Sequence, residues 1–387
     1  MITNNEPANA MRHSVSASPE LRSQAIPGPP IHLAVQHQRS TPPDLRKTGL
    51  CPDYWYPFAR SEQVARGKTL GVSFAGEPIV LVRTERGNVF ALENRCAHRQ
   101  IPLEAGVIRG ELLQCCYHGW TYDSTGACVN VPYLDKAGAL PNGVRSYPCR
   151  EAYGLIFVYP GDPARQNDAR FPQISNHGDR NYKIRYLDRR IACHYSFMHE
   201  NLMDMNHQIL HRRLMRGIKA ELLDIRTGDK WVEVDYTFAR ETGWDPFYEK
   251  MIGRRRAPTE DRERDLMTIR TEYPYQTLKF WRIGNEHPAL DLWNVYIPFD
   301  REQRTNHTFG LMMLRMPSVP GLPLLIWPIF VWFTNFIFKE DRWAVEKEQE
   351  AFDAQGADWN NEISPPILQL RKLLVHCGVP LSTGQIG

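Results

Sequence analysis

The sequence lacks the charge imbalance that is typical of nucleic-acid-binding proteins. Its 387 residues contain 47 lysines and arginines against 44 aspartates and glutamates, a formal net charge of +3. That charge is too small to indicate a nucleic acid or an acidic substrate. No basic run with interleaved aromatic residues is present either, so nucleic-acid binding is disfavoured.

Three other features are missing. The 8 cysteines are too few for a disulfide scaffold in 387 residues, and the N-terminus shows no charged leader followed by an apolar core and a cleavage site. No Gly-x-Gly-x-x-Gly motif is present, so we expect no nicotinamide or flavin site in this chain. We therefore expect a cytoplasmic protein, in which clustered Cys and His residues indicate metal ligation.

The chain has one long uncharged apolar run, of 17 residues from Leu322 to Phe338. A membrane-spanning helix needs about 20 residues, and Pro323 and Pro328 interrupt this run, so we do not expect it to span a membrane. We expect a buried segment that lines an apolar cavity. The alternative is a membrane-associated surface with Trp327 and Trp332 as interfacial anchors. Both interpretations predict a lipophilic or aromatic ligand.

The length predicts about two domains. Residues 1–46 are polar and rich in Pro, Ser and Asn, which predicts a disordered segment with order beginning near Trp55. Residues 47–162 read as short strands separated by turns, typical of a small antiparallel β domain. A polar stretch over 161–180 marks the boundary to a second domain over 163–387.

The second domain is predicted to be α+β, because its strands and helices are segregated along the chain. A helix is expected over 194–216, and two more over 340–355 and 365–376. Between them lie candidates for long strands, with alternating apolar and polar residues that suit a sheet with one wet face. These candidates are 231–238, 266–281, 290–297 and 308–316.

The strongest motif is Cys96-Ala-His98 followed, after 16 residues, by Cys115-Cys-Tyr-His118. Two loops that each supply one thiolate and one imidazole can hold a [2Fe–2S] cluster of the Rieske type, with the cysteines on one iron and the histidines on the other. Neutral imidazoles in place of anionic thiolates raise the reduction potential. The spacing alone also admits a zinc site. Cys115, rather than Cys116, has the two-residue gap to His118.

A second constellation is Asn201-Leu-Met-Asp204-Met-Asn-His207-Gln-Ile-Leu-His211. Histidines four residues apart share one face of a helix, and Asp204 precedes His207 by three residues. Two histidines and a carboxylate, with open coordination positions, form the facial triad of non-haem Fe(II) oxygenases. The alternative is a solvated helix face.

Taken together, Cys-x-His, Cys-x-x-His-Gly-Trp and Asn-x-x-Asp-x-x-His-x-x-x-His resemble the Rieske-type non-haem iron oxygenases, the family of ring-hydroxylating oxygenase α-subunits. The resemblance implies a helix-grip (START-like) catalytic domain with an antiparallel sheet and C-terminal helices. It also implies a homotrimer, in which Asp204 links His207 to His118 of the next subunit. Asn201 is expected near the iron.

The resemblance further implies a third iron ligand at the start of a C-terminal helix. The pair Glu340-Asp341 matches the family's Glu-Asp pattern, so we expect Asp341 to bind the mononuclear iron with His207 and His211. Glu340 and Asp204 are the competing candidates. A pair of carboxylates here could instead serve only to favour a helix N-terminus through the macrodipole.

By the same resemblance the chain is a terminal oxygenase that uses Fe(II) and O2. Electrons come from NAD(P)H through a partner reductase, sometimes with a ferredoxin. The expected reaction is hydroxylation, demethylation or desaturation of a lipophilic or aromatic small molecule, with monooxygenation favoured. The alternative is a Rieske electron-transfer protein with a non-catalytic second domain.

Overall fold

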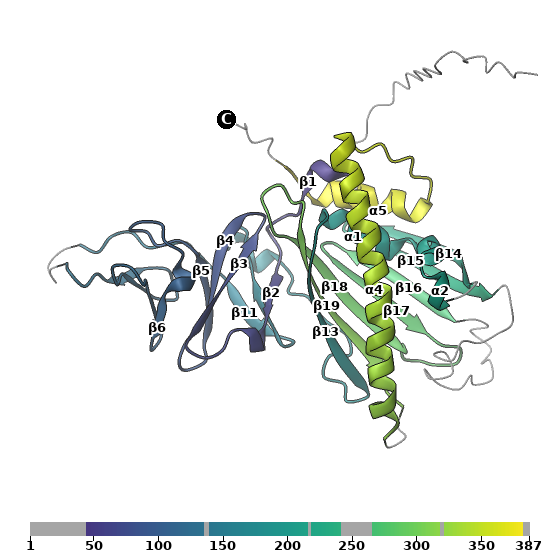
Figure 1. The fold of residues 1–387 in the computed structure, drawn as a ribbon, viewed down its shortest axis with the longest axis horizontal. Helices are drawn as coiled ribbons and strands as arrows, with labels where there is room; N and C mark the ends of the chain where they lie inside the picture. The colour runs from purple at the N-terminus through teal and green to yellow at the C-terminus, as the bar shows by residue number, and fades with distance from the viewer. Residues whose placement is uncertain (1–43, 135–138, 216–217, 241–264, 318–320, 382–387) are drawn as a thin grey trace, which may run out of the picture. The chain divides into compact units, whose positions relative to one another are not determined.

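The computed structural model describes residues 44–134, 139–215, 218–240, 265–317 and 321–381 (Figure 1). Most of the segment predicted to be disordered, residues 1–43, lies outside the described residues. The sequence predicted that order begins near Trp55, but the chain is already ordered before that residue. Residues 45–47 already form a 3₁₀ turn in which Leu45 and Arg46 are buried. The composition of this segment did not predict its order, because the residues that contact it lie in distant parts of the chain.

The N-terminal part of the described chain consists of short antiparallel strands in several small sheets, as predicted. One sheet has the strand order β10-β5-β4-β3, a second β11-β12-β2 and a third β6-β7-β8-β9. The β3–β4 hairpin turns at Ala75 and Gly76, which both have positive φ, the combination that matches the twist of paired strands. The bounds are β2 Tyr56–Arg60, β3 Lys68–Phe74, β4 Glu77–Arg83, β5 Val89–Glu93, β6 Val107–Arg109, β7 Leu112–Gln114, β8 Thr121–Tyr122, β9 Cys128–Asn130, β10 Ser146–Tyr147, β11 Cys149–Ala152 and β12 Leu155–Val158, with 3₁₀ turns at Ser61–Gln63, Leu103–Ala105 and Pro163–Asp168.

The C-terminal part is built on one antiparallel sheet of seven strands among the described residues, in the order β13-β19-β18-β17-β16-β15-β14 (Figure 1). The segment predicted as a single strand over 266–281 is two strands that reverse at Tyr273-Pro274. Alternation continues on both sides of this tight turn, so the pattern did not reveal it. The bounds are β13 Tyr182–Ile191, β14 Ile218–Gly228, β15 Trp231–Arg240, β16 Leu266–Glu272, β17 Tyr275–Trp281, β18 Leu290–Pro298 and β19 Asn306–Arg315.

The helix predicted over 194–216 is interrupted. Helix α1 covers Tyr195–Met203, a 3₁₀ helix covers Met205–Ile209, and α2 covers Arg212–Met215. The break falls at Asp204, whose backbone is extended and whose carboxylate accepts a hydrogen bond from the Asn206 amide. Aspartate offers the chain this local cap in place of a continuing helix, so His207 and His211 are not on one continuous α-helix.

Helix α4, Leu322–Gln355, corrects two expectations. The apolar run and the helix predicted from residue 340 are one continuous helix, with Pro323 in its first turn and Pro328 tolerated inside it. The apolar run is also largely exposed and not a core segment. Its most buried side chains follow one stripe at four-residue spacing, formed by Ile326, Phe330, Thr334 and Phe338. Beside this stripe, Trp327 and Asn335 meet basic side chains of β13. A single helix on a sheet buries one stripe only.

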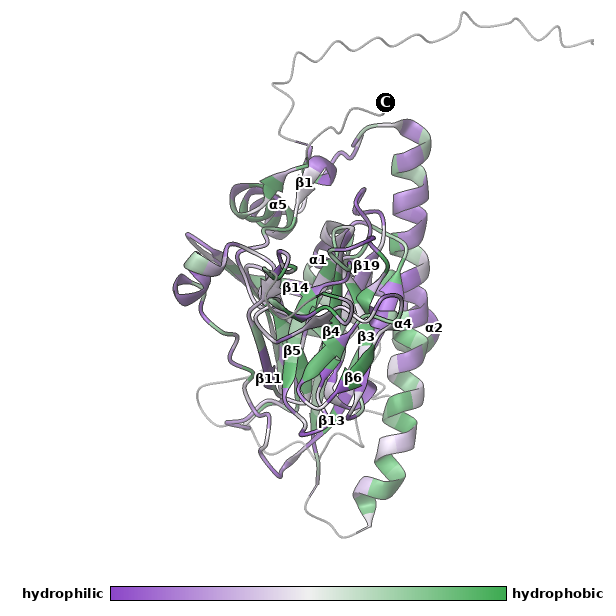
Figure 2. Ribbon diagram, turned by 90° about the vertical axis from the view of Figure 1, so that its left-hand side faces the viewer, coloured by the Kyte–Doolittle hydropathy of each residue, from purple (hydrophilic) through white to green (hydrophobic). Residues whose placement is uncertain are grey.

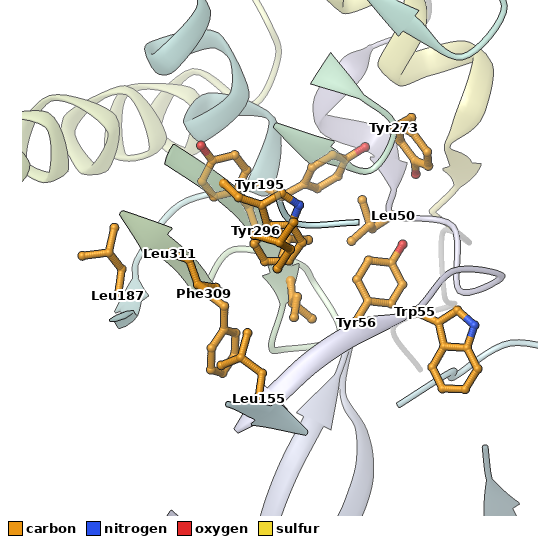
Figure 3. Packing of buried hydrophobic residues seen from close by; sticks show 14 of the residues in the cluster. Leu50, Trp55, Tyr56, Leu155, Leu187, Tyr195, Tyr273, Tyr296, Phe309 and Leu311 are labelled. Carbon is orange, nitrogen blue, oxygen red and sulfur yellow. The ribbon is translucent and has the colours of Figure 1, made fainter. Parts of the chain in front are cut away.

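The two parts of the described chain share a hydrophobic core. Tyr56 and Leu155 from the small sheets and Tyr296, Phe309 and Leu311 from the large sheet belong to one buried cluster (Figure 3). The ends of the described chain are also joined, because β1 (Thr48–Gly49) pairs with β20 (Val379–Pro380) after helix α5 (Pro365–Cys377).

An ion-pair network fixes α1 to both ends of the described chain. Buried Arg46 contacts Glu200 at 2.5 Å, and Arg371 on α5 contacts the other oxygen of the same carboxylate. The Arg46 guanidinium also lies 3.6 Å from the ring centroid of Phe197. Helix α1, which leads into the predicted iron ligands, is therefore held in place by paired charges rather than by apolar packing alone.

Candidate metal sites

The two loops that carry the Cys-His pairs come together at one end of the small β domain. Cys96 and Cys115 are both buried in a compact apolar cluster. The rings of His98 and His118 lie 4.5 Å apart between centroids, at an interplanar angle of 66°. The structure therefore brings together all four residues that the sequence predicted as cluster ligands.

Each loop is shaped by backbone hydrogen bonds across its own turn. In the first loop the Cys96 amide donates to Ile101 at 2.9 Å, and in the second the Cys115 amide donates to Trp120 at 2.8 Å. Gly119 has φ +72°, and a Cβ there would meet Pro132 at 2.9 Å. The glycine that follows His118 is therefore required by a left-handed turn and by close packing.

Two aromatic residues support these loops, and the sequence reading did not assign them a role. The Tyr122 hydroxyl lies 3.2 Å from the Cys96 Sγ and accepts a hydrogen bond from the Ala97 amide. The Trp120 ring stacks on His98 at 4.8 Å and 3°. Trp120 follows the Cys-x-x-His motif by one glycine, and this proximity was the available signal. Tyr122 had none beyond its place in a strand.

The second site lies between the 3₁₀ helix after α1 and the middle of α4. One ligand atom each from His207, His211 and Asp341 lie within 4.8 Å of one another. Oδ1 of Asp341 is 3.1 Å from Nε2 of His211 and 3.6 Å from Nε2 of His207. Of the three carboxylates considered from the sequence, the structure thus brings Asp341 to the histidine pair.

Asp204 contacts His207 in a way that the sequence did not indicate. The contact to the Nδ1 of His207 comes from the Asp204 backbone carbonyl. The carboxylate instead accepts hydrogen bonds from the amide and the side chain of Asn206, both at 2.9 Å. The carbonyl fixes the ring so that its Nε2 is directed at Asp341.

Glu340 lies beside the site but does not belong to the group of converging atoms. Its Oε2 is 2.8 Å from the Nδ1 of His211, on the opposite side of the ring from Asp341. Burial of His211 opposes protonation, yet the hydrogen bonds and charges of Asp341 and Glu340 outweigh it and raise the pKa of His211. The consecutive pair Glu340-Asp341 therefore holds both nitrogens of one imidazole.

A pocket opens beside this site. Its lining includes Asp341 and Asn201, so the structure places Asn201 on the same pocket as Asp341. Most other lining side chains are apolar or aromatic, and they come from α1, β13, β18 and α4. A ligand in this pocket would have its apolar body against these side chains and one end beside Asp341.

Comparison with known proteins assigns both parts of the chain. The Rieske [2Fe-2S] domain matches residues 54–148, and the vanillate O-demethylase oxygenase C-terminal domain matches residues 191–372. The 4β-methylsterol monooxygenase of Methylococcus capsulatus is 31% identical over 346 residues, which cover 85% of this chain and 89% of that protein. The chain belongs to the Rieske non-haem iron oxygenases.

Other members of the family are also similar to this chain. The oxygenase component of dicamba O-demethylase from Stenotrophomonas maltophilia is 36% identical over 159 residues, 41% of this chain and 47% of that protein. A crystal structure of dicamba monooxygenase bound to dicamba superposes with a TM-score of 0.67 at 22% identity, covering 85% of this chain and 97% of the other. That likeness confirms the predicted α+β fold with a Rieske domain.

Membership confirms that this Rieske oxygenase is a terminal oxygenase whose family uses a Rieske cluster and a mononuclear iron. A plain electron carrier and a zinc module are thereby set aside, because the second half matches an oxygenase domain. Relatives are named as the oxygenase component of one system and the iron-sulfur subunit of another. Members of the family therefore work together with other protein components.

The residues present fit these cofactors. Nδ1 of His98 is buried without a hydrogen-bonding partner, and the buried Nε2 of His211 and Oδ1 of Asp341 have only each other in reach, at 3.1 Å. Leaving three such polar atoms unsatisfied would be costly unless another group completes them. One of these atoms lies in the first site and two lie in the second. Both places are therefore suited to metal ions.

Glu340 is expected to strengthen iron binding without touching the iron. Glu340→Gln keeps the side-chain shape but removes the charge beside His211, and outer partners of this kind contribute about 10–100-fold to metal affinity. We expect the iron affinity of the second site to fall in that range, as measured by competition with a ferrous chelator. Glu350→Gln is the control, because Glu350 is exposed on the same helix and pairs with Lys347. Equal affinities for the two variants would contradict this role.

Proposed function

We propose that this Rieske oxygenase oxidises a lipophilic small molecule at an iron held by His207, His211 and Asp341. The observation that carries the proposal is the convergence of these three side chains, within 4.8 Å, at an apolar pocket. The proposed ligands of the [2Fe–2S] cluster are Cys96, His98, Cys115 and His118. When bound, the cluster supplies electrons one at a time and the mononuclear iron supplies O2 activation.

The residues around the second site hold the proposed ligands in position. The Asp204 carbonyl accepts a hydrogen bond from the His207 Nδ1–H, which leaves Nε2 of that ring as the ligand atom. Glu340 does the same for His211 through Nδ1. With both rings oriented in this way, two imidazole nitrogens and one carboxylate converge, and the same carboxylate of Asp341 also lines the pocket.

We also propose that the enzyme works as a homotrimer in the cytoplasm, with a partner reductase that is supplied by NAD(P)H, and that Asp204 connects two subunits. Asn206 orients one oxygen of the Asp204 carboxylate, and the carbonyl of the same residue orients His207. A single residue thereby links the position of a carboxylate to that of an iron ligand. In a trimer this carboxylate would accept a hydrogen bond from His118 of the next subunit and so couple the two sites.

The substrate class follows from the pocket. Most of its lining side chains are apolar or aromatic, which favours a ligand with a lipophilic body, while Arg189 and Arg342 could pair with one polar end of that ligand. The lining side chains that exclude water are Leu187, Ile191, Met198, Leu202, Leu292 and Phe338. Relatives are named for a methylsterol and for dicamba, and these names support hydroxylation or demethylation of a methyl or methoxy group on a fused-ring or aromatic body.

The test is turnover in the presence of ¹⁸O2. The purified enzyme, a surrogate reductase and NADH would be given a panel of methylsterols, methoxy-aromatics and small charged aromatic acids, with products identified by mass spectrometry. We expect one ¹⁸O atom in the product of a lipophilic substrate, while the second atom leaves as water with two electrons and two protons. Demethylation would instead release labelled formaldehyde.

The control is the same reaction with the His211→Ala enzyme, which should give unlabelled, unchanged substrate. A product that contains two labelled oxygen atoms would show that the enzyme is a dioxygenase and not a monooxygenase. Turnover of charged acids alone, with a cluster that is reduced normally, would contradict the lipophilic substrate class.

A further inference from the structure

We propose that the N-terminal half of α4, residues 322–338, is a docking surface for an anionic lipid membrane and lies flat on it. Below, this segment is called the apolar half-helix. The proposal goes beyond the reaction itself, and it rests on the proposed function only in giving the surface a use, namely access to a substrate dissolved in lipid.

The first observation is exposure. Leu324, Leu325 and Trp332 are 74%, 69% and 60% exposed. Across the most apolar window of α4 only 11% of the residues are buried. Isolated apolar residues on a surface are ordinary, but a contiguous exposed patch marks an interaction site. Figure 2 shows the change along the helix, from hydrophobic at its N-terminal end to hydrophilic beyond its middle.

The exposed residues gather on one face. At about 100° per residue, Leu324, Leu325, Pro328 and Trp332 project to the side opposite the stripe of contacts that begins at Ile326. No charged residue occurs between positions 322 and 338. The outward face of the apolar half-helix is therefore not interrupted by charge, and its inward face packs against the protein.

The geometry favours lying on a membrane over crossing it. Seventeen helical residues extend only about 25 Å, which is shorter than the roughly 30 Å of a bilayer core. The helix continues directly into Lys339 and then Asp341, and the latter is fixed 3.1 Å from His211. A helix that is anchored at a buried site and exposes one apolar face suits the plane of the interface.

Basic side chains along the base of the apolar half-helix favour a lipid surface with negative charge. Lys183 on β13 places its ammonium 4.4 Å from the ring centroid of Trp327. Arg185 and Arg189 on the same strand donate hydrogen bonds to Asn335 at 2.6 and 2.7 Å. Exposed Lys339 follows at the end of the run. Basic side chains near a membrane surface strengthen its binding when the lipids are anionic.

The helix also connects this surface with the pocket. Phe338, the last residue of the apolar half-helix, lines the pocket together with Asp341 of the next turn. A lipophilic molecule dissolved in the outer layer of a membrane would thus lie beside the helix that forms one wall of the site. Contact with a second copy of the chain would make no use of the connection between this helix and the pocket. We therefore favour lipid as the occupant.

The experiment is vesicle flotation with the full-length, iron-loaded protein, using neutral phosphatidylcholine vesicles and vesicles with about one-third phosphatidylglycerol. We expect binding to the anionic vesicles that weakens at high salt, because the electrostatic part is screened. Trp332→Glu, and Leu324→Glu combined with Leu325→Glu, should each lower the partition coefficient at least about tenfold, because each places a charge on the face that meets the lipid.

Trp343→Glu is the matched control. Trp343 is 59% exposed on the same helix but lies beyond the apolar half-helix, so its replacement should leave vesicle binding within about twofold of the unmodified protein. Iron content and cluster spectrum should be unchanged in every variant, which separates a failure here from a failure of the proposed reaction.

Two results would overturn the proposal. The first is that the unmodified protein stays in the aqueous fraction with both vesicle types, or that Trp332→Glu and Trp343→Glu bind equally well. The second is that the Trp332→Glu and Leu324/Leu325 variants change the oligomeric state in solution without changing flotation. That outcome would assign the apolar half-helix to contact between copies of the chain.

Discussion

Replacing His211 with alanine is expected to reduce the iron content from about three to about two atoms per chain and to reduce substrate oxidation to background. His211 is buried, and its two nitrogens face Asp341 and Glu340. Without the ring, two carboxylates remain beside one half-buried histidine, a set that offers a ferrous ion only one imidazole ligand. The loss of activity should exceed the roughly 10–100-fold expected for an outer partner such as Glu340.

The measurement pairs iron analysis with the Rieske electron resonance signal after reduction by dithionite. The signal should persist in His211→Ala, because the proposed cluster ligands lie in the other domain. His376→Ala is the control, since His376 is exposed near the end of α5 and its loss should change neither quantity. Retention of three irons, or of substantial turnover, in His211→Ala would show that the second site has been assigned to the wrong residues.

Replacing Cys115 with serine is expected to eliminate the [2Fe–2S] cluster, whereas the same change at the adjacent Cys116 should leave it intact. Cys115 is buried in the cluster of apolar side chains that also contains Cys96, while Cys116 is exposed. Burial raises the pKa of the Cys115 thiol despite backbone hydrogen bonds that act in the opposite direction, so a metal is the group that would stabilise its thiolate there.

The two proteins should be distinguishable by eye and by spectroscopy. Cys115→Ser should lose the brown colour and the Rieske signal, and its N-terminal domain should unfold at lower temperature, because binding energy for a structural metal contributes to folding. Cys116→Ser should match the unmodified protein. A normal cluster in Cys115→Ser, together with its loss in Cys116→Ser, would reverse the ligand assignment.

These two variants also test the proposed trimer. Cys115→Ser and His211→Ala should each be inactive alone, because each lacks one of the two sites. Co-expressed chains would form mixed trimers, in which an intact cluster of one subunit lies beside an intact iron site of the next. Recovery of a measurable fraction of activity in the mixture supports transfer between subunits. Complete inactivity, in trimers shown to be mixed, would place the transfer within one chain.

The sequence by itself carried the prediction of both sites. The spacing of Cys96, His98, Cys115 and His118 predicts a cluster ligand set, because such a set can lie on short turns that local sequence encodes. The four-residue spacing of His207 and His211 likewise predicts a ligand pair, but it does not predict the local backbone. A regular helix was expected, and the capping side chain of Asp204 breaks it.

What only the tertiary structure decided are the relations between distant segments. Spacing could not choose between Asp204, which lies close to the histidine pair in sequence, and the distant Glu340 and Asp341 as its partner. The packing of α4 against α1 settled which carboxylate faces the pair and which one holds the ring from behind. The exposure of residues 322–338 was likewise beyond composition, because an apolar run looks the same whether a protein covers it or not. Local bonding encodes ligand spacing, whereas burial depends on which surfaces the folded chain has left to cover.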